Sequence, residues 1–118
     1  MGDKKHLADL YGKELKMKLI KCLSEKIEEE ISDSCSYIDL AMKYKNDYPD
    51  TADVFYELSL AEMKHMDKLH GEVVELIEEY RKENGEPPKE MMTLYEYLHE
   101  RHIGDATKVK VKQGMYKA

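Results

Sequence analysis

The sequence predicts an all-α fold in which a long antiparallel helical hairpin is followed by a third helix. Charged residues make up 37% and apolar residues 42% of the 118 residues, with only three prolines, a balance typical of long, solvent-exposed helices. Two segments rich in helix-breaking residues interrupt the chain, and between them apolar residues recur at steps of three and four. We therefore expect one domain, residues 1–118, with helices over about residues 5–46, 51–83 and 87–112.

Proline, asparagine and glycine mark the two breaks. Pro49 is expected to end the first helix, and Asp50 or Thr51 is suited to cap the second. The segment 84–88 reads Asn-Gly-Glu-Pro-Pro, in which the first two residues favour a helix end and the prolines favour the first turn of a new helix. Helices of this length exceed the globular average, which favours a bundle or a coiled-coil-like hairpin.

Each helix of the hairpin carries a stripe of apolar residues that ionisable residues interrupt. The stripe on the first helix consists of Ile20, Leu23, Ile27, Glu30, Ser34, Tyr37, Ala41 and Tyr44. The stripe on the second helix consists of Phe55, Leu58, Glu62, His65, Leu69, Val73, Leu76 and Tyr80. We expect both stripes to be buried. A buried carboxylate must be paired, protonated or bound to a metal ion, so Glu30, Glu62 and His65 need a common explanation.

Glu62 and His65 form a Glu-x-x-His unit, whose spacing projects both side chains from one face of a helix. Measured from the turn at 1.5 Å per residue, Glu30 lies about 24 Å along the first helix. On the same scale Glu62 lies about 17 Å and His65 about 21 Å along the second helix. The three side chains are therefore expected at similar heights in the hairpin, where one metal ion can reach all of them.

The third helix holds another Glu-x-x-His unit, formed by Glu96 and His99, which shows that such a unit also arises by chance. Glu96 lies about 14 Å past its turn and His65 about 27 Å before it, so the two are expected at different levels. His102 lies nearer the right height but has no paired carboxylate. We interpret His70, His99 and His102 as surface or interface residues and leave the role of the third helix open.

Glu30, with Tyr37 seven residues later and Glu62-x-x-His65 on the next helix, resembles the first half of ferritin-like di-iron proteins. These include rubrerythrins, bacterioferritins and the short encapsulated ferritins, and the resemblance covers about residues 15–83. It implies that Glu30 is the first-helix ligand, Glu62 the bridging carboxylate and His65 the imidazole ligand. It also implies a catalytic role for Tyr37 as a hydrogen-bonding or redox-active neighbour of the site.

The chain departs from the family by supplying only half of the ligand set. A complete ferritin-like site takes glutamate from each of two helices and Glu-x-x-His from each of two others. Two chains related by a two-fold axis would supply six ligands for two metal ions. The resemblance therefore implies a homodimer, or a multiple of dimers, that completes a four-helix bundle, with an encapsulating shell as a candidate protein partner.

The implied activity is that of a ferroxidase, which oxidises ferrous iron with oxygen or peroxide. Carboxylates with imidazole suit iron or manganese, although zinc competes for such sites. Two other interpretations stay open. Glu62 and His65 are also consistent with a buried polar pair that fixes helix register in a non-enzymatic assembly module. A third possibility is a carboxylate–histidine zinc or manganese site that has no redox role.

Charge and composition narrow the classes of partner. The net charge is −6, with 25 acidic against 19 basic residues, which disfavours binding to nucleic acid. No segment approaches the ~20 apolar residues of a membrane span, and the N-terminus lacks the apolar core of a signal peptide. Two cysteines are too few for a disulfide scaffold, so we expect a soluble, cytoplasmic protein without a membrane partner.

Overall fold

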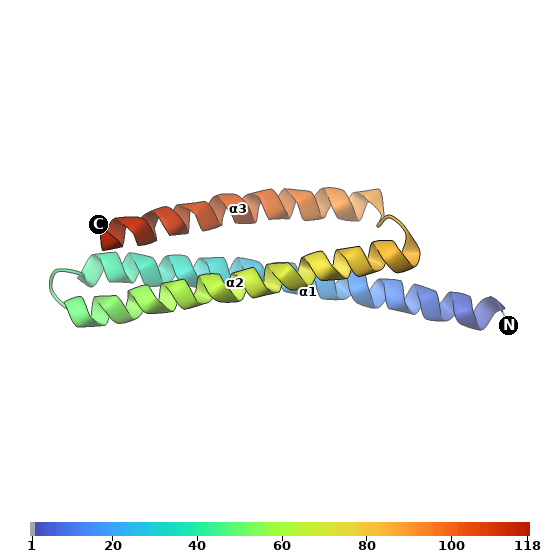
Figure 1. Ribbon diagram of the computed structural model, residues 1–118, viewed down its shortest axis with the longest axis horizontal. Helices are drawn as coiled ribbons and strands as arrows, with labels where there is room; N and C mark the ends of the chain where they lie inside the picture. Colours follow the sequence, from blue (N-terminus) through green and yellow to red (C-terminus); the bar gives the residue numbers. More distant parts are fainter. Residues whose placement is uncertain (1) are drawn as a thin grey trace.

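A computed structural model describes residues 2–118 and confirms the all-α fold (Figure 1). The three helices are α1, Gly2–Tyr44, α2, Pro49–Asn84, and α3, Lys89–Lys117, and residues 2–118 contain no strand. α1 and α2 form the long antiparallel hairpin, and α3 runs back along it (Figure 1). The molecule is a rod with extents of 70 × 21 × 16 Å. None of the described helices combines the length and the apolar character needed to cross a membrane.

The helix boundaries differ from the predicted ones in small but explicable ways. α2 begins at Pro49 itself, because proline has no backbone N–H to lose and suits the first helical position. α3 begins at Lys89 rather than at residue 87, since Pro88 precedes the helix in an extended conformation. The largest difference lies at the C-terminal end of α3, which continues to Lys117 instead of ending near residue 112.

Contacts with the hairpin explain why α3 extends so far. Tyr116 is buried, its ring stacks on Tyr56 with centroids 4.9 Å apart, and its hydroxyl donates a hydrogen bond to Asp53. Burial first, and then the bond to Asp53, raise the pKa of Tyr116 to about 12. One turn earlier, Gln113 Nε2 donates a hydrogen bond to Ser59 Oγ at 2.9 Å. Tertiary contacts of this kind override weak local propensity at a helix end.

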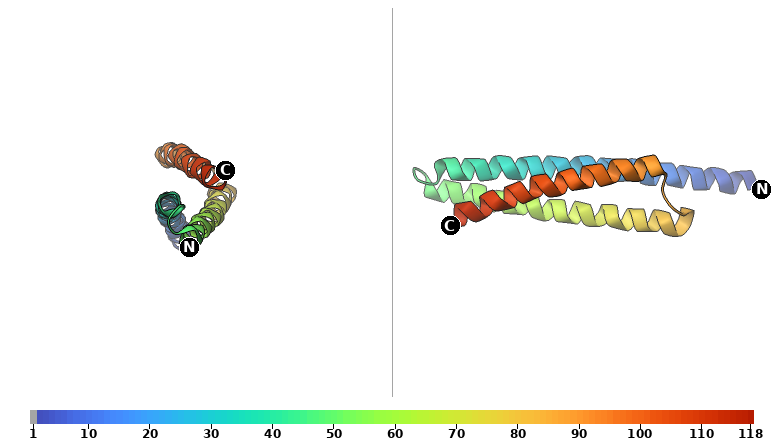
Figure 2. Two further views of the ribbon diagram at one scale, coloured as in Figure 1. Left: turned by 90° about the vertical axis from the view of Figure 1, so that its left-hand side faces the viewer. Right: turned by 90° about the horizontal axis from the view of Figure 1, so that it is seen from above.

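α3 crosses the hairpin obliquely, so its two halves have different neighbours (Figure 2). Along α1 it forms ion pairs from Arg101 to Glu28 at 3.4 Å and from Lys112 to Asp39 at 2.8 Å. Only its C-terminal half is tied to α2 by the Gln113 and Tyr116 bonds described above. Its N-terminal half lies further from α2 and leaves a groove between these two helices.

The expectation that both stripes are fully buried is wrong for the single chain. Leu58 is 38% exposed, and the side chain of His65 is 55% exposed. The other residues on this side of α1 and α2 are only partly buried. Together with Leu58 and His65 they form one strip, which we call the hairpin face. It comprises Leu23, Glu30, Tyr37 and Tyr44 of α1 and Phe55, Leu58, Glu62, His65, Leu69 and Leu76 of α2. This face is apolar except at its centre, and it lacks a covering helix because α3 packs elsewhere.

Candidate metal centre

Two serines set the distance between α1 and α2 near the centre of the hairpin. Ser34 and Ser59 are fully buried, and each hydroxyl donates to the backbone carbonyl of the other residue, at 2.7 and 2.8 Å. Such small side chains let two helices approach closely, and the reciprocal bonds fix their register. Glu30 precedes Ser34 by four residues, and Glu62 follows Ser59 by three, so this contact brings both glutamates to the same level.

The structure brings together the three residues that the sequence predicts as metal ligands. One ligand atom from each of Glu30, Glu62 and His65 lies within 4.8 Å of the other two. His65 Nδ1 is 3.6 Å from Glu30 Oε2 and 3.6 Å from Glu62 Oε2. Glu62 and His65 leave α2 from one face, as expected for residues three apart, and Glu30 faces them from α1.

The carboxylates of this cluster retain unused coordinating capacity. The side chains of Glu30 and Glu62 are 24% and 19% exposed, whereas that of His65 is 55% exposed. Glu30 Oε2 is buried and finds no hydrogen-bond partner among the described residues. Its separation of 3.6 Å from His65 Nδ1 is too long for a hydrogen bond. Leaving a buried acceptor unsatisfied costs about 1–3 kcal/mol, more for a charged group, and a bound cation would remove that cost.

The donor set fits a hard or borderline divalent cation. Two carboxylates and one imidazole suit iron or manganese, and zinc is a competitor on affinity alone. The three ligands of one chain leave positions vacant around an octahedral ion. Water or ligands from a second chain must fill those positions.

The cluster faces away from α3. Glu28 and Asp39 hold α3 through the two ion pairs described above, and each lies roughly half a turn around α1 from Glu30. The three ligands therefore open onto the hairpin face. As expected from their height, Glu96 and His99 do not join the cluster, and His102 of α3 does not join it either.

Tyr37 is placed beside the cluster along α1 but is not part of it. Its ring is partly buried and stacks on Phe55 with centroids 6.3 Å apart. Seven residues separate Tyr37 from Glu30, which corresponds to about 10 Å along the helix axis. Packing against Phe55 is thus the contact that the structure gives it.

Of the histidines interpreted as surface or interface residues, His102 is not on the surface, because it is only 7% exposed. His70 and His99 are partly buried, and their rings stack with centroids 4.7 Å apart. These residues line the groove between α2 and α3. His70 and His99 lie at similar distances along their helices from the turn at residues 84–88. Comparing these distances in the sequence could have revealed this group.

Comparison with known proteins adds no relative. No family model matches the chain, and neither the curated proteins nor the solved structures include a match. The ferritin-like resemblance therefore rests on Glu30, Tyr37, Glu62 and His65 and on the helical hairpin that carries them.

Proposed function

We propose that this chain is a metal-binding protein of ferritin-like type, in which two copies share a carboxylate-bridged di-iron centre and oxidise ferrous iron with oxygen or peroxide. One observation carries the proposal. Glu30, Glu62 and His65 place three ligand atoms within 4.8 Å of one another, and one of the carboxylate oxygens is buried without a hydrogen-bond partner.

The hairpin face supports a second copy as the missing half of the site. Apolar residues at heptad spacing surround the cluster on both helices and remain partly exposed, among them Leu58 at 38% and Leu69. A second hairpin packed face to face would bury them and complete a four-helix bundle. A two-fold axis through the centre would bring two sets of three ligands together, six donors for two ions.

Each residue then has a distinct task. Glu30, Glu62 and His65 would hold the ions, with Glu62 in the role that the ferritin-like resemblance gives to the bridging carboxylate and Glu30 and His65 as terminal ligands. Bound iron would supply the one-electron redox chemistry, with ferrous ions as the substrate and oxygen or peroxide as the electron acceptor. Tyr37, about 10 Å along α1, is the tyrosine nearest Glu30 on that helix and could supply or hold one electron.

Replacement by leucine separates this proposal from the assembly-module alternative. A register device requires a buried polar pair, and in the single chain the imidazole of His65 is 55% exposed. A dimer would bury that imidazole under either interpretation, so its exposure does not distinguish the two. If Glu62 and His65 only fix the register, the Glu62→Leu/His65→Leu variant should form a stable dimer whose stability does not change with metal. If they bind metal, the same variant should lose its metal-dependent stability.

Ferrous loading under anaerobic conditions tests the proposal. Chelator-treated protein is titrated with Fe²⁺, metal content is measured by elemental analysis, and mass is measured by sedimentation. We expect about one iron per chain in a dimer or a multiple of dimers. Glu62→Gln/His65→Gln should lose the iron, and Glu72→Gln, a change at an exposed glutamate of the same helix, should keep it.

Iron that fails to bind, or that binds equally to the Glu62→Gln/His65→Gln variant, would contradict the proposal. The bound iron could also be oxidised by oxygen or peroxide no faster than free ferrous ion. That result would support a metal site and contradict the ferroxidase activity. The zinc or manganese interpretation predicts that second result.

A further inference from the structure

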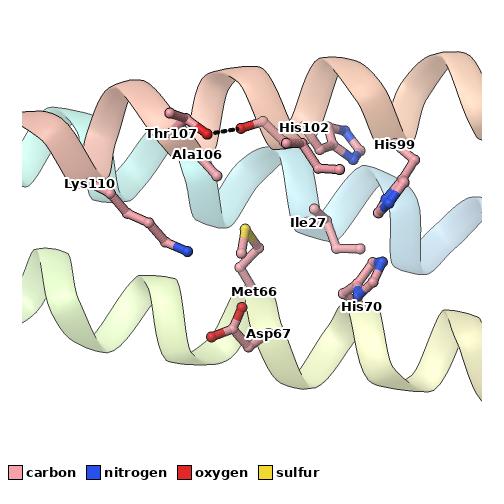
Figure 3. A pocket seen from close by; sticks show the side chains of 10 residues that line it. Ile27, Met66, Asp67, His70, His99, His102, Ala106, Thr107 and Lys110 are labelled. Carbon is pink, nitrogen blue, oxygen red and sulfur yellow. Dashed lines mark hydrogen bonds between the residues drawn. The ribbon is translucent and has the colours of Figure 1, made fainter.

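The groove between α2 and α3 has a volume of about 340 Å³ and is lined by histidines from both helices (Figure 3). His70 projects from α2 toward His99 on α3, and His102 lies one turn further along α3 (Figure 3). The apolar floor includes Ile27 of α1 and Met66 of α2. None of these three histidines belongs to the Glu30 cluster, which opens on a separate side of the hairpin.

The three histidines are placed by helical spacing along α3 and by the stacking of one ring pair between α2 and α3. His99 and His102 are three residues apart, so both leave one face of α3. The rings of His70 and His99 stack with centroids 4.7 Å apart and an interplanar angle of 11°, which shows that the two helices hold these residues at one level. Three imidazoles from two helices thus surround one end of the groove.

Two of these rings have a buried nitrogen that the protein does not satisfy. His70 Nε2 and His102 Nε2 are buried, and neither finds a hydrogen-bond partner among the described residues. His102 as a whole is only 7% exposed. Buried polar groups without partners are uncommon in folded proteins and point to an unseen ligand, ion or water.

Burial also acts on the pKa of two of these three rings. Burial, and then the neighbouring His99, lower the pKa of His70. Burial likewise lowers the pKa of His102, against the smaller opposing effects of Glu28 and Asp105. Neutral imidazole presents a free lone pair, whereas the protonated ring does not.

We propose that His70, His99 and His102 form a second metal site, which binds a borderline divalent cation such as Zn²⁺ with water in the fourth position. Imidazole donors suit zinc, copper or nickel better than they suit calcium or magnesium, and a three-histidine set leaves one tetrahedral position open to the groove. Within the described residues, only the Glu30 cluster already has three ligand atoms within 4.8 Å of one another. To hold an ion, the stacked rings of His70 and His99 would have to turn their nitrogens toward it.

A bound ion would fasten the N-terminal half of α3 to α2. The C-terminal half of α3 is hydrogen-bonded to α2 through Gln113 and Tyr116, whereas the half that carries His99 meets α2 through the stacked ring of His70 beside an open groove. Binding to the folded chain alone raises its stability by RT ln(1 + L/Kd), where L is the free ligand concentration. The melting temperature should thus keep rising with the logarithm of the zinc concentration above Kd.

The test uses the full chain with the Glu62→Gln/His65→Gln changes, which remove the hairpin cluster and leave the groove intact. Chelator-treated protein is titrated with Zn²⁺ by calorimetry and with Co²⁺ by visible absorption, where tetrahedral coordination gives intense bands. We expect one ion per chain and a tetrahedral Co²⁺ spectrum that Zn²⁺ abolishes. Added to this background, His70→Gln or His99→Gln should each weaken zinc binding by roughly tenfold or more.

Glu100→Gln, a change at an exposed residue next to His99, is the matched control and should bind zinc as tightly as the background protein. Circular dichroism reports whether each variant keeps its helices. The titration of the background protein tests the proposal even if the His70→Gln or His99→Gln variant fails to fold. Absence of zinc binding in the background protein would overturn the proposal. Binding that is unchanged by both His70→Gln and His99→Gln would overturn it equally, since the histidines would then serve only as packing.

Discussion

The hairpin face and the α2–α3 groove lie on separate sides of the same hairpin and present different donor atoms. On the hairpin face, two carboxylates and a half-exposed imidazole already stand within 4.8 Å of one another. In the groove, the rings of His70 and His99 stack and His102 lies nearby, but their nitrogens do not converge on one point. In our proposals a second copy completes the first set, whereas the second set lies wholly within one chain.

The two donor sets differ in the metal ions that they would prefer. Carboxylate oxygens favour iron or manganese, and imidazole nitrogens favour zinc, copper or nickel. The hairpin cluster is fixed by the Ser34–Ser59 contact near the centre of the hairpin. The groove depends on the position of α3, whose hydrogen bonds to α2 from Gln113 and Tyr116 lie near its C-terminal end.

Replacing Glu30, whose Oε2 is buried, should have the largest effect on metal binding. This effect should be confined to the hairpin face. Glu30→Leu removes an unpartnered buried acceptor, so we expect the metal-free protein to gain about 1 kcal/mol in free energy of unfolding. The same change should weaken iron binding by roughly 100-fold. Urea unfolding and ferrous titration measure the two effects.

Glu29→Leu, at the exposed neighbouring position, is the control and should leave iron binding unchanged. A loss of stability in metal-free Glu30→Leu would show that the carboxylate is satisfied in solution. That result would remove the main reason for placing a cation beside it.

Separating the two helices at the serine contact should damage the cluster next. Ser34→Val removes the hydrogen bond to the Ser59 carbonyl and adds volume where the helices touch, at a cost of about 2 kcal/mol. Iron binding should weaken with it, because Glu30 and Glu62 lose their common level. Ser36→Val, a change at an exposed position two residues away, should change neither quantity.

Loosening α3 should affect the groove and spare the hairpin face. Tyr116→Phe removes the hydroxyl that bonds Asp53, so we expect a loss of about 1 kcal/mol and weaker zinc binding with unchanged iron binding. Equal weakening at both sites would contradict the separation of the two regions.

The same variant should alter the response to alkali. Burial and the Asp53 bond raise the pKa of Tyr116 from 10.0 in the unfolded chain to about 12. The contribution of this group to stability is therefore full below pH 10 and is lost as the pH rises from 10 toward 12. Urea unfolding across this range should show a steeper loss for the wild-type chain than for Tyr116→Phe.

The surface ion pair between Arg101 and Glu28 should matter least. Both side chains are about half exposed, at 53% and 50%, and their atoms are 3.4 Å apart. Arg101→Ala should change the free energy of unfolding by no more than about 0.5 kcal/mol and should leave both metal affinities unchanged. A larger change would indicate that this pair, rather than Gln113 and Tyr116, holds α3 in place.

The sequence predicts the hairpin and the grouping of its three ligands because both follow from local rules. Helical periodicity places Glu62 and His65 on one face, and the rise per residue places Glu30 at the same height. The extension of α3 to Lys117 could not be predicted this way, since it depends on contacts of Gln113 and Tyr116 with a distant part of the chain.

The exposure of Leu58 and His65 likewise follows from tertiary arrangement. A stripe of apolar periodicity shows which side of a helix seeks a partner, but it does not show whether that partner is in the same chain. α3 packs on the other side of α1 and leaves the stripe partly open. The histidine groove was missed for a related reason, because its members belong to helices whose pairing the sequence does not specify.

An anomalous diffraction map of crystals of the full chain, grown with ferrous iron under anaerobic conditions, tests the central claim most directly. We expect two iron peaks about 3.5–4 Å apart, related by a two-fold axis that passes between them. Both peaks should lie within coordinating distance of Glu30, Glu62 and His65 from two copies. Iron at a single position held by one chain, or no iron at these residues, would contradict a shared di-iron centre.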